Sequence, residues 1–353
     1  MATHHLDDSQ PHAFWDNAHP PRLRIQPGDT VVFETLEASA NQVTPASTHE
    51  VLMALDFGLI HPLTGPVYVE GAEPGDALVV EILRLQHKGW GWNGVIPNFA
   101  LLADDFQQPY LHHYRLGRGY CEFRDDIRIP FEPFCGVMGV APEEAGRLST
   151  IPPRRNGGNI DIRHLTPGAV VRFPVLAPGA LFSCGDCHSA QGDGEVNGTG
   201  IETPMTVTLR FGLEKGANLP ELRFVTPPGK KLTVTDEAGY YVATAHGPDL
   251  FRNSQQAIRY VIDYLAAEHG MTREQAYCLC GAAVDLKISE IVDAPNWIVS
   301  AYLPLSIFRS LKLAPKRAAA KPKAKPRAKA AARGKAKAAA RTTRRPAKRR
   351  TRR

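Results

Sequence analysis

The segment PGDTVVFET, residues 27–35, joins a Pro-Gly turn to a run rich in β-branched residues. The same order recurs as PGDALVVEI at 74–82 and PGAVVRFPV at 167–175, with a weaker copy, PGALFSC, at 178–184. Pro at the second and Gly at the third position suit a type II turn, and each turn leads into a predicted strand. The recurrence predicts a mainly β protein and leaves open whether one β unit is duplicated.

Strand-like runs continue along the chain, at residues 127–133, 203–211, 221–226, 231–236 and 240–245. Because these runs are short and separated by turn residues, they favour a β-sandwich-like architecture.

Helical periodicity appears only late in the chain. Apolar residues recur at three- and four-residue steps over 249–268, which predicts an amphipathic helix. Thr272 followed by Gln275 forms a capping box that would begin a second helix over 272–286. We therefore expect a β-rich body with some α structure, in the form of a C-terminal helical pair.

The charge of the chain is unevenly distributed. The net charge is +6, but residues 312–353 hold 19 Lys and Arg and no acid. The remaining 23 Lys and Arg oppose 36 Asp and Glu, which gives residues 1–311 a formal charge of −13. The Lys/Arg/Ala/Pro-rich segment 312–353 has little to bury, so we predict a disordered basic tail after a catalytic domain over 1–311. Such a tail predicts nonspecific contact with nucleic acid or other polyanions.

The first residues, MATHHLDDSQ, lack the basic and apolar regions of a secretory signal. No stretch approaches 18 consecutive apolar residues, so we expect no membrane association. Both features predict a cytoplasmic protein, in which the six cysteines stay reduced.

The segment CGDCHSAQGDGE, residues 184–195, concentrates the reactive side chains. Its C-x-x-C-H string matches a haem attachment signal, but haem attachment requires export. Structural zinc would need a second ligand pair, and Cys278-x-Cys280 has the wrong spacing on a predicted helix, where both are expected in the core. No helix follows, as a redox dithiol would require. The glycines of 192–198 are one residue too far apart for a dinucleotide fingerprint.

Without its cysteines the segment still contains a carboxylate beside an imidazole. On an extended strand Asp186 and His188 project from the same face, as suits a catalytic divalent metal with a position open for water. The glycines that follow permit a turn that returns Asp193 and Glu195 over the strand. One of these acids would then serve as general base if burial raises its pKa. A turn with solvated acids remains the alternative.

The pattern GDxHxxQGDGExxGTxIE, residues 185–202, resembles the signature of the acetamidase/formamidase family. The resemblance extends over residues 10–310 through several other phrases, namely WDN at 15–17, HPLTGPVYVEGAEPGD at 61–76, GWNGVIPNFALLADDF at 91–106, GGNIDIRHL at 157–165 and the helical AYCLCGAAVDLKISEIVDAPN at 276–296.

The resemblance implies an oligomeric, cytoplasmic amidohydrolase with a β-rich, sandwich-like fold and a bound metal, zinc above all. Its substrates would be formamide, acetamide or similar short amides, from which it releases ammonia. The family's functional positions carry over to Asp186, His188, Gln191, Asp193 and Glu195. The chain departs from the family at Cys184 and Cys187, so neither thiol is expected to take part in catalysis.

We expect Asp186, His188 and His61 to hold the metal. His61 precedes the loop PLTGP, and His49 is a rival for the same role. A metal held in this way would polarise the amide carbonyl or the attacking water.

Glu195 is the expected base that later protonates the departing ammonia, and Asp193 is expected to orient it. We expect Gln191, Trp92 and Asn159 to contact the substrate, with Asp161 behind them or in a turn. Aromatic residues of the neighbouring block, Trp90, Phe99 and Phe106, are candidates for apolar walls.

A second hypothesis is a catalytically silent β-rich binding protein that associates with nucleic acid through its tail. A third, an electron-transfer haem protein, rests only on the C-x-x-C-H string. The set formed by Asp186, His188, Asp193 and Glu195 favours the amide hydrolase.

Overall fold

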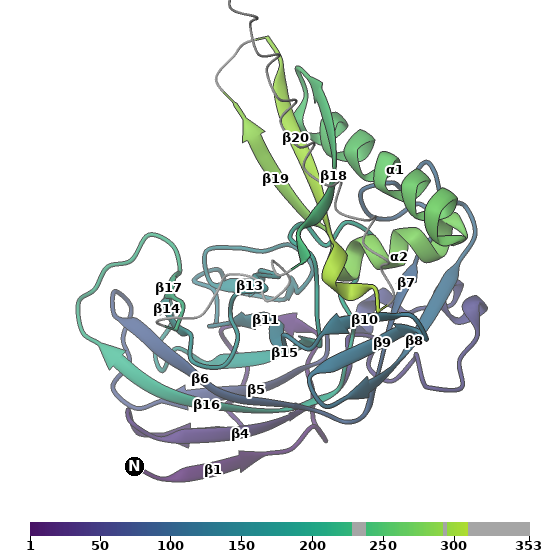
Figure 1. The fold of residues 1–353 in the computed structure, drawn as a ribbon. Coiled ribbons are helices and arrows are strands. Elements are labelled where there is room, and N and C mark those ends of the chain that lie inside the picture. Colours follow the sequence, from purple (N-terminus) through teal and green to yellow (C-terminus); the bar gives the residue numbers. More distant parts are fainter. Residues whose placement is uncertain (228–237, 292–294, 310–353) are drawn as a thin grey trace, which may run out of the picture. The chain divides into compact units, whose positions relative to one another are not determined.

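The computed structural model describes residues 1–227, 238–291 and 295–309. In these residues the strands form five sheets, and two α-helices follow near the C-terminal end (Figure 1). The predicted mainly β fold class is therefore confirmed. The predicted strand at 231–236 and the basic tail lie outside the described residues.

The largest sheet explains why the Pro-Gly turns recur. Its strands, in spatial order, are β1 (Thr3–Leu6), β4 (Thr30–Thr35), β16 (Met205–Glu214), β6 (Ala77–His87), β14 (Val170–Pro174) and β17 (Arg223–Val225). The three stronger turn copies precede β4, β6 and β14, so they all feed strands of this one sheet. The predictions of strands at 203–211 and 221–226 are confirmed by β16 and β17.

A second sheet packs against the first. It contains β13 (Gly157–Asn159), β11 (Phe134–Gly139), β15 (Phe182–His188), β5 (Leu63–Val69) and β3 (Leu23–Ile25). The ring of Phe182 on β15 lies 6.2 Å from that of Phe33 on β4 and 5.2 Å from that of Phe211 on β16, in edge-to-face geometry. Aromatic side chains from both sheets thus share one buried core, which confirms the predicted sandwich.

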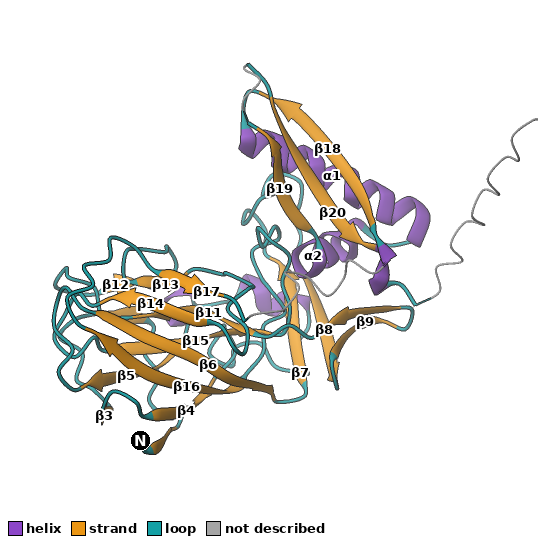
Figure 2. Ribbon diagram, turned by 60° about the vertical axis from the view of Figure 1, so that its left-hand side comes forward, coloured by secondary structure: helices purple, strands orange, loops and turns teal. Residues whose placement is uncertain are grey.

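Two further sheets and the two helices surround a second core. Four strands form one sheet, in the order β10 (Ile127–Pro130), β9 (Tyr120–Arg124), β8 (Tyr110–Gly117) and β7 (Trp90–Val95). Three others form a sheet in the order β18 (Tyr240–Gly247), β20 (Trp297–Pro304) and β19 (Asp285–Glu290), with α1 beside it in both views (Figure 2). A short pair joins β12 (Leu148–Ser149) to β2 (Phe14–Trp15).

The helical pair is α1 (Leu250–His269) and α2 (Arg273–Ala283). The predicted capping box is present: the Thr272 side chain accepts from the backbone of Gln275, and the Gln275 side chain accepts from the backbone of Thr272. The prediction that the second helix continues to residue 286 was wrong. Val284 is extended, and the following residues pair with β20 as β19, because strand pairing satisfies their backbone groups instead.

Short 3-10 turns complete the chain at η1 (His49–Met53), η2 (Phe57–Leu59) and η4 (Leu305–Ile307). In the part of the chain that the structure describes, neither α-helix has the length and apolar character needed to cross a bilayer.

Candidate active site

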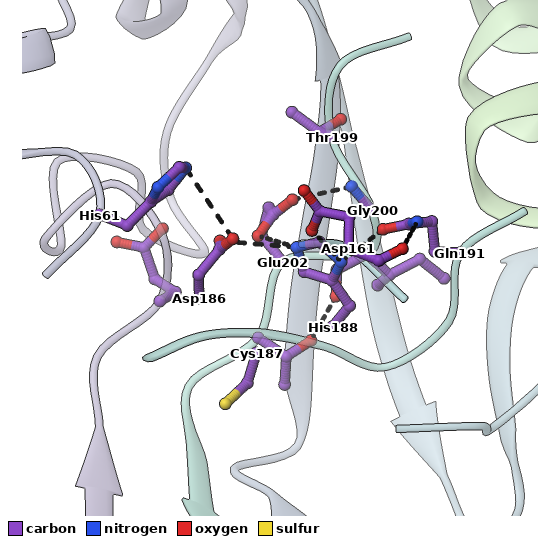
Figure 3. A network of polar contacts seen from close by, with 12 residues as sticks. His61, Asp161, Asp186, Cys187, His188, Gln191, Thr199, Gly200 and Glu202 are labelled. Carbon is purple, nitrogen blue, oxygen red and sulfur yellow. Dashed lines mark hydrogen bonds and ion pairs between the residues drawn. The ribbon is translucent and has the colours of Figure 1, made fainter. Parts of the chain in front are cut away.

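A pocket with a volume of about 100 Å³ contains most of the side chains singled out from the sequence. Five of the eight predicted site residues line it: His61, Trp92, Asn159, Asp186 and Glu195. His188 and Gln191 are 1% and 2% exposed and lie directly behind this lining, where they contact it (Figure 3). The predicted site is thus largely assembled by the fold.

An irregularity in β15 separates the polar side chains of Asp186 and His188 from the cysteine side chains that pack in the core. Cys184 and Cys187 both pack in the sandwich core, although residues three apart on a regular strand face opposite sides. Asp186 between them has a left-handed backbone, with φ of +49°, which breaks the alternation. The Cys187 sulfur points away from the polar cluster (Figure 3). The C-x-x-C spacing therefore comes from core packing around an irregular strand.

The imidazole of His188 is the centre of the cluster. Its Nε2 lies 3.1 Å from Oε2 of Glu202, 3.5 Å from Oδ1 of Asp186 and 3.9 Å from Oε1 of Glu195 (Figure 3). Three carboxylates thus surround one nitrogen that is itself buried. Asp186 and His188 lie together, as expected, but on the irregular part of β15 rather than on a regular extended strand.

The other ring nitrogen of His188 has a defined partner. Gln191 donates through Nε2 to the backbone carbonyl of Asp161 at 3.0 Å, which turns its Oε1 toward Nδ1 of His188 at 2.8 Å. Because this oxygen can only accept, Nδ1 carries a hydrogen. In the neutral imidazole Nε2 then presents a lone pair to the carboxylates, so Gln191 positions the histidine rather than lining the pocket.

Burial and mutual charge control the ionisation of this cluster. Burial would lower the pKa of His188, but the charges of Glu202 and Asp186 outweigh it and raise that pKa well above its ordinary value. Burial raises the pKa of Glu202 to about 8 and that of Asp161 to about 7. Burial also raises the pKa of Glu195 well above its usual range, and the charge of Asp161 adds to this. The buried carboxylates therefore strongly favour a positive charge among them.

Two glycines make room for the cluster. A Cβ on Gly136 of β11 would lie 2.6 Å from carboxylate oxygens of both Asp161 and Asp186. A Cβ on Gly200 would lie 2.5 Å from Nδ1 of His188. Any larger side chain at these two positions would displace the polar groups, so both glycines belong to the site.

The structure distinguishes the two candidate histidines. His61 lines the pocket, and its Nε2 lies 3.9 Å from Oδ2 of Asp186. His49 starts η1 and packs its ring edge-to-face against Tyr110, with centroids 4.9 Å apart. His49 is not part of the pocket lining, so the geometry favours His61.

Two predicted substrate contacts have different surroundings. Trp92 is 2% exposed and donates through Nε1 to Oε2 of Glu37 at 2.8 Å, which fixes its ring in the pocket wall. Asn159 donates through Nδ2 to the carbonyl of Ile151 at 3.0 Å. Its Oδ1 is buried and has no hydrogen-bond partner in the described part of the chain, so an acceptor remains available in the pocket.

Asp193, like His188 and Gln191, lies outside the pocket lining. Its backbone N–H donates to Oδ1 of Asp285 at 3.0 Å, and its carbonyl accepts from Leu286 at 3.0 Å. Asp285 in turn forms a buried ion pair with Arg163. These contacts attach the turn around Asp193 to the start of β19.

The donor atoms of the cluster fit a divalent cation. Among the described residues, His188 Nε2, Glu202 Oε2 and Asp161 Oδ1 are buried and have no hydrogen-bond partner. Ligand atoms of His188, Glu195 and Glu202 lie within 4.8 Å of one another, and so do those of Asp161, Asp186 and His188. Imidazole and carboxylate are the donor types found in catalytic zinc sites.

Comparison with known proteins accounts for this arrangement. The acetamidase/formamidase family matches residues 2–146 and 143–310. The chain belongs to the acetamidase/formamidase family. This confirms the resemblance drawn from residues 185–202 and makes the chain a hydrolase that acts on amide C–N bonds.

Relatives named as amide hydrolases cover most of the chain. A formamidase of Methylophilus methylotrophus is 29% identical over 371 residues, which span 85% of this chain and 90% of the relative. An acetamidase of Mycolicibacterium smegmatis is 27% identical over 77% of this chain and 85% of its own length. Among solved structures, a γ-lactamase from Delftia acidovorans is 26% identical, with a TM-score of 0.81 over 88% of this chain and 94% of that one.

The C-terminal block of the amidohydrolase supports the active-site loop. The backbone N–H of Gly192 donates to the carbonyl of Gly281 on α2 at 2.8 Å, and the Tyr277 hydroxyl donates to the carbonyl of Val196. A Cβ on Gly192 would lie 2.1 Å from the carbonyl oxygen of Val284. The loop thus lies directly on α2.

Sequence reasoning assigned no role to Glu202 and only a supporting role to Asp161, although both line the pocket. Glu202 ends the family motif and accepts from the backbone of Gly200 at 2.8 Å, which aims its other oxygen at His188. The position of Glu202 at the end of the motif was the one sequence feature that could have indicated its role. Asp161 is brought in by the loop after β13, with a left-handed φ of +44°, which no local pattern indicates.

Proposed function

We propose that this amidohydrolase acts on short aliphatic amides such as formamide and acetamide and releases the carboxylate and ammonia. The pocket volume of about 100 Å³ is the observation that carries the proposal. A cavity of roughly 150 Å³ holds the six carbons of benzene, so this pocket has room for about four heavy atoms. Acetamide has that size, and the relatives named formamidase and acetamidase support the same substrate class.

We propose that a divalent metal, zinc in the first place, is held by Asp186, His188 and His61, with Glu202 as a further ligand. The unpaired Nε2 of His188 and Oε2 of Glu202 support this set, as does the Nε2 of His61 beside Asp186. A cation bound there would polarise the amide carbonyl and make a water molecule more acidic.

The surrounding residues then perform the proton transfers. Glu195 lies at the pocket surface with a raised pKa, so it can accept a proton from the attacking water and return it to the departing ammonia. Asn159 Oδ1, which has no partner among the described residues, would accept a hydrogen bond from the amide nitrogen of the substrate. In this proposal Asp193 holds the turn that carries Glu195, through its backbone contacts with β19.

Ammonia release from formamide, acetamide and propionamide, measured with and without a chelator, tests the reaction and the metal together. Turnover that is lost with chelator and restored by zinc is the expected result. Turnover that survives complete metal removal would overturn the metal assignment. The absence of turnover on every short amide would overturn the substrate assignment.

We also propose that the chain is a cytoplasmic homo-oligomer, as the family resemblance implies, and that residues 312–353 contact polyanions without sequence preference. The 19 Lys and Arg of the tail, with no acid among them, support the second point. Binding of random-sequence DNA that weakens steeply between low and physiological salt would support it, and salt-independent binding would contradict it.

A further inference from the structure

One buried hydroxyl holds the peptide bond that precedes the His61 side chain. Thr150 is fully buried, and its Oγ1 donates to the carbonyl of Ile60 at 2.8 Å and accepts from the backbone N–H of His61 at 3.1 Å. A hydroxyl offers one hydrogen and two lone pairs, so it can bind an acceptor and a donor at once. Both polar groups of the Ile60–His61 peptide are therefore fixed by a residue that follows His61 by 89 positions.

The ring of His61 has no comparable support of its own. Its Nδ1 is buried without a hydrogen-bond partner in the described part of the chain, and its Nε2 lies 3.9 Å from Oδ2 of Asp186, beyond hydrogen-bond distance (Figure 3). His188 differs, because Gln191 holds its Nδ1. With no hydrogen bond to the ring, the position of His61 depends on how its backbone is held. We propose that Thr150 is a positioning residue of the active site, whose hydroxyl fixes the backbone from which His61 faces Asp186.

The segment that carries Thr150 is itself anchored on both sides. It follows β12, which pairs with β2. Beyond it, Arg154 donates through Nη1 to the carbonyls of Ser149 at 2.7 Å and Pro152 at 2.9 Å, which ties together the residues on either side of Thr150. Because the hydroxyl stands on a segment that is held in this way, it can impose a defined position on the His61 peptide.

The same segment holds a second pocket residue. The carbonyl of Ile151 accepts from Nδ2 of Asn159, and Ile151, Asn159 and His61 all line the pocket. Thr150 and Ile151 therefore link the proposed metal ligand to the proposed substrate contact. The contact with Asn159 uses a backbone carbonyl, so it remains when only the hydroxyl of Thr150 is removed. Loss of that hydroxyl should thus affect His61 and leave Asn159 in place.

This inference rests on the proposed metal site, and zinc binding tests it. Thr150→Val keeps the shape of the side chain but removes the hydroxyl. We expect the zinc Kd, measured by competition with a chelator of known affinity, to weaken about 10- to 100-fold, the range typical of residues that orient metal ligands. Thr150→Ser, which keeps the hydroxyl, should have a Kd close to that of the unmodified chain. An unchanged Kd in Thr150→Val would overturn the inference.

Thr64→Val is the matched control. Thr64 on β5 is also buried, its hydroxyl donates to the carbonyl of Glu34 at 2.7 Å, and it does not line the pocket. Since each variant loses buried hydrogen bonding, Tm should fall in both, but the zinc Kd should weaken only in Thr150→Val. Equal weakening in the two variants would show a general loosening of the fold and overturn the positioning role. If Thr150→Val does not fold, Thr150→Ala removes the same hydroxyl and carries the test.

A structural measurement separates this inference from the proposed metal. If the unmodified chain binds no divalent metal, the metal assignment fails, and crystal structures of the unmodified chain and of Thr150→Val then test the positioning role by themselves. A His61 ring that lies farther from Asp186 by about 1 Å or more in the variant would support the role, since shifts of this size impair active sites. An equal separation of Nε2 and Oδ2 in the two proteins would overturn it.

Discussion

His188 Nε2 lies 3.1 Å from Glu202 Oε2, yet neither atom has a hydrogen-bond partner among the described residues. Because Gln191 keeps the hydrogen of the neutral ring on Nδ1, a lone pair and a carboxylate oxygen face each other. Such an arrangement repels unless a cation lies between the atoms. A metal ion, or a proton on the histidine, meets this requirement.

Replacement of Glu202 by Gln distinguishes a bound metal ion from a proton on His188. The new amide keeps an oxygen for the Gly200 N–H and offers a donor to His188, so the fold should be retained without a cation. We expect zinc content, measured by elemental analysis, to fall from stoichiometric to a small fraction, with little change in Tm. Full metal content in this variant would contradict the ligand role of Glu202.

Gln191→Ala removes the group that positions the histidine. Outer partners of metal ligands typically contribute about 10- to 100-fold in metal affinity, and we expect a loss in this range. The zinc Kd, measured by competition with a chelator of known affinity, checks it. Gln86→Ala, on the exposed side of β6, should leave the Kd unchanged.

Glu195→Gln keeps the shape of the proposed base but cannot accept a proton. We expect kcat for acetamide to fall roughly 10²- to 10⁴-fold with the fold and the metal content retained. Glu144→Gln, on an exposed loop away from the pocket, is the matched control. Near-normal turnover of the Glu195 variant would remove this residue from the proton transfers.

Gly200→Ala tests the space behind the histidine ring. A Cβ 2.5 Å from Nδ1 of His188 would force the ring away from its partners, and a misplacement of about 1 Å can lower turnover about 100-fold. Gly212→Ala on β16 has its nearest contact at 3.4 Å and should be nearly neutral. Equal activity of the two variants would show that the ring adapts.

Acid should destabilise the fold through His12, whose burial lowers its pKa to about 4. Its ring contacts the carbonyl of Phe14 and the hydroxyl of Ser183. The unfolded chain takes up the proton once the pH drops below about 6.5, whereas the folded chain takes it up only near pH 4. The free energy of unfolding therefore decreases as the pH is lowered from about 6.5 to 4, by roughly 3 kcal/mol.

Urea unfolding at pH 7 and pH 4.5 checks this. His12→Gln should lose less stability between these two pH values than the unmodified chain does, whereas the exposed His5→Gln should match the unmodified chain. An identical loss in all three proteins would assign the acid sensitivity to other groups.

Local sequence patterns predicted most of the helices and strands but not the boundary between α2 and β19. Alternating apolar residues after Pro-Gly turns identified β4, β6 and β14, and the pair Thr272 and Gln275 identified the start of α2. The end of α2 depends on pairing between β19 and β20, which joins residues that are distant in sequence. A helical pattern that continues past Ala283 conceals that pairing.

The same limit applies to the site. Asp186, His188 and Glu195 lie within ten residues, and their spacing indicated a shared site, although the same spacing also placed Asp193 there. Asp161 reaches the cluster through a separate loop, and Gly136 contributes only by the space it leaves. Left-handed backbone at Asp186 and Glu195 is imposed by the surrounding structure, since neither residue type requires it.

The support that α2 gives to the active-site loop has a consequence for synthesis. The loop around Gly192 is complete some ninety residues before Gly281 and Val284, on which it lies, have been added to the chain. A ribosome-bound chain that stops before α2 therefore exposes the motif without its supporting surface. Ammonia release should begin only once the helical pair has left the exit tunnel, so that turnover reports the completion of folding.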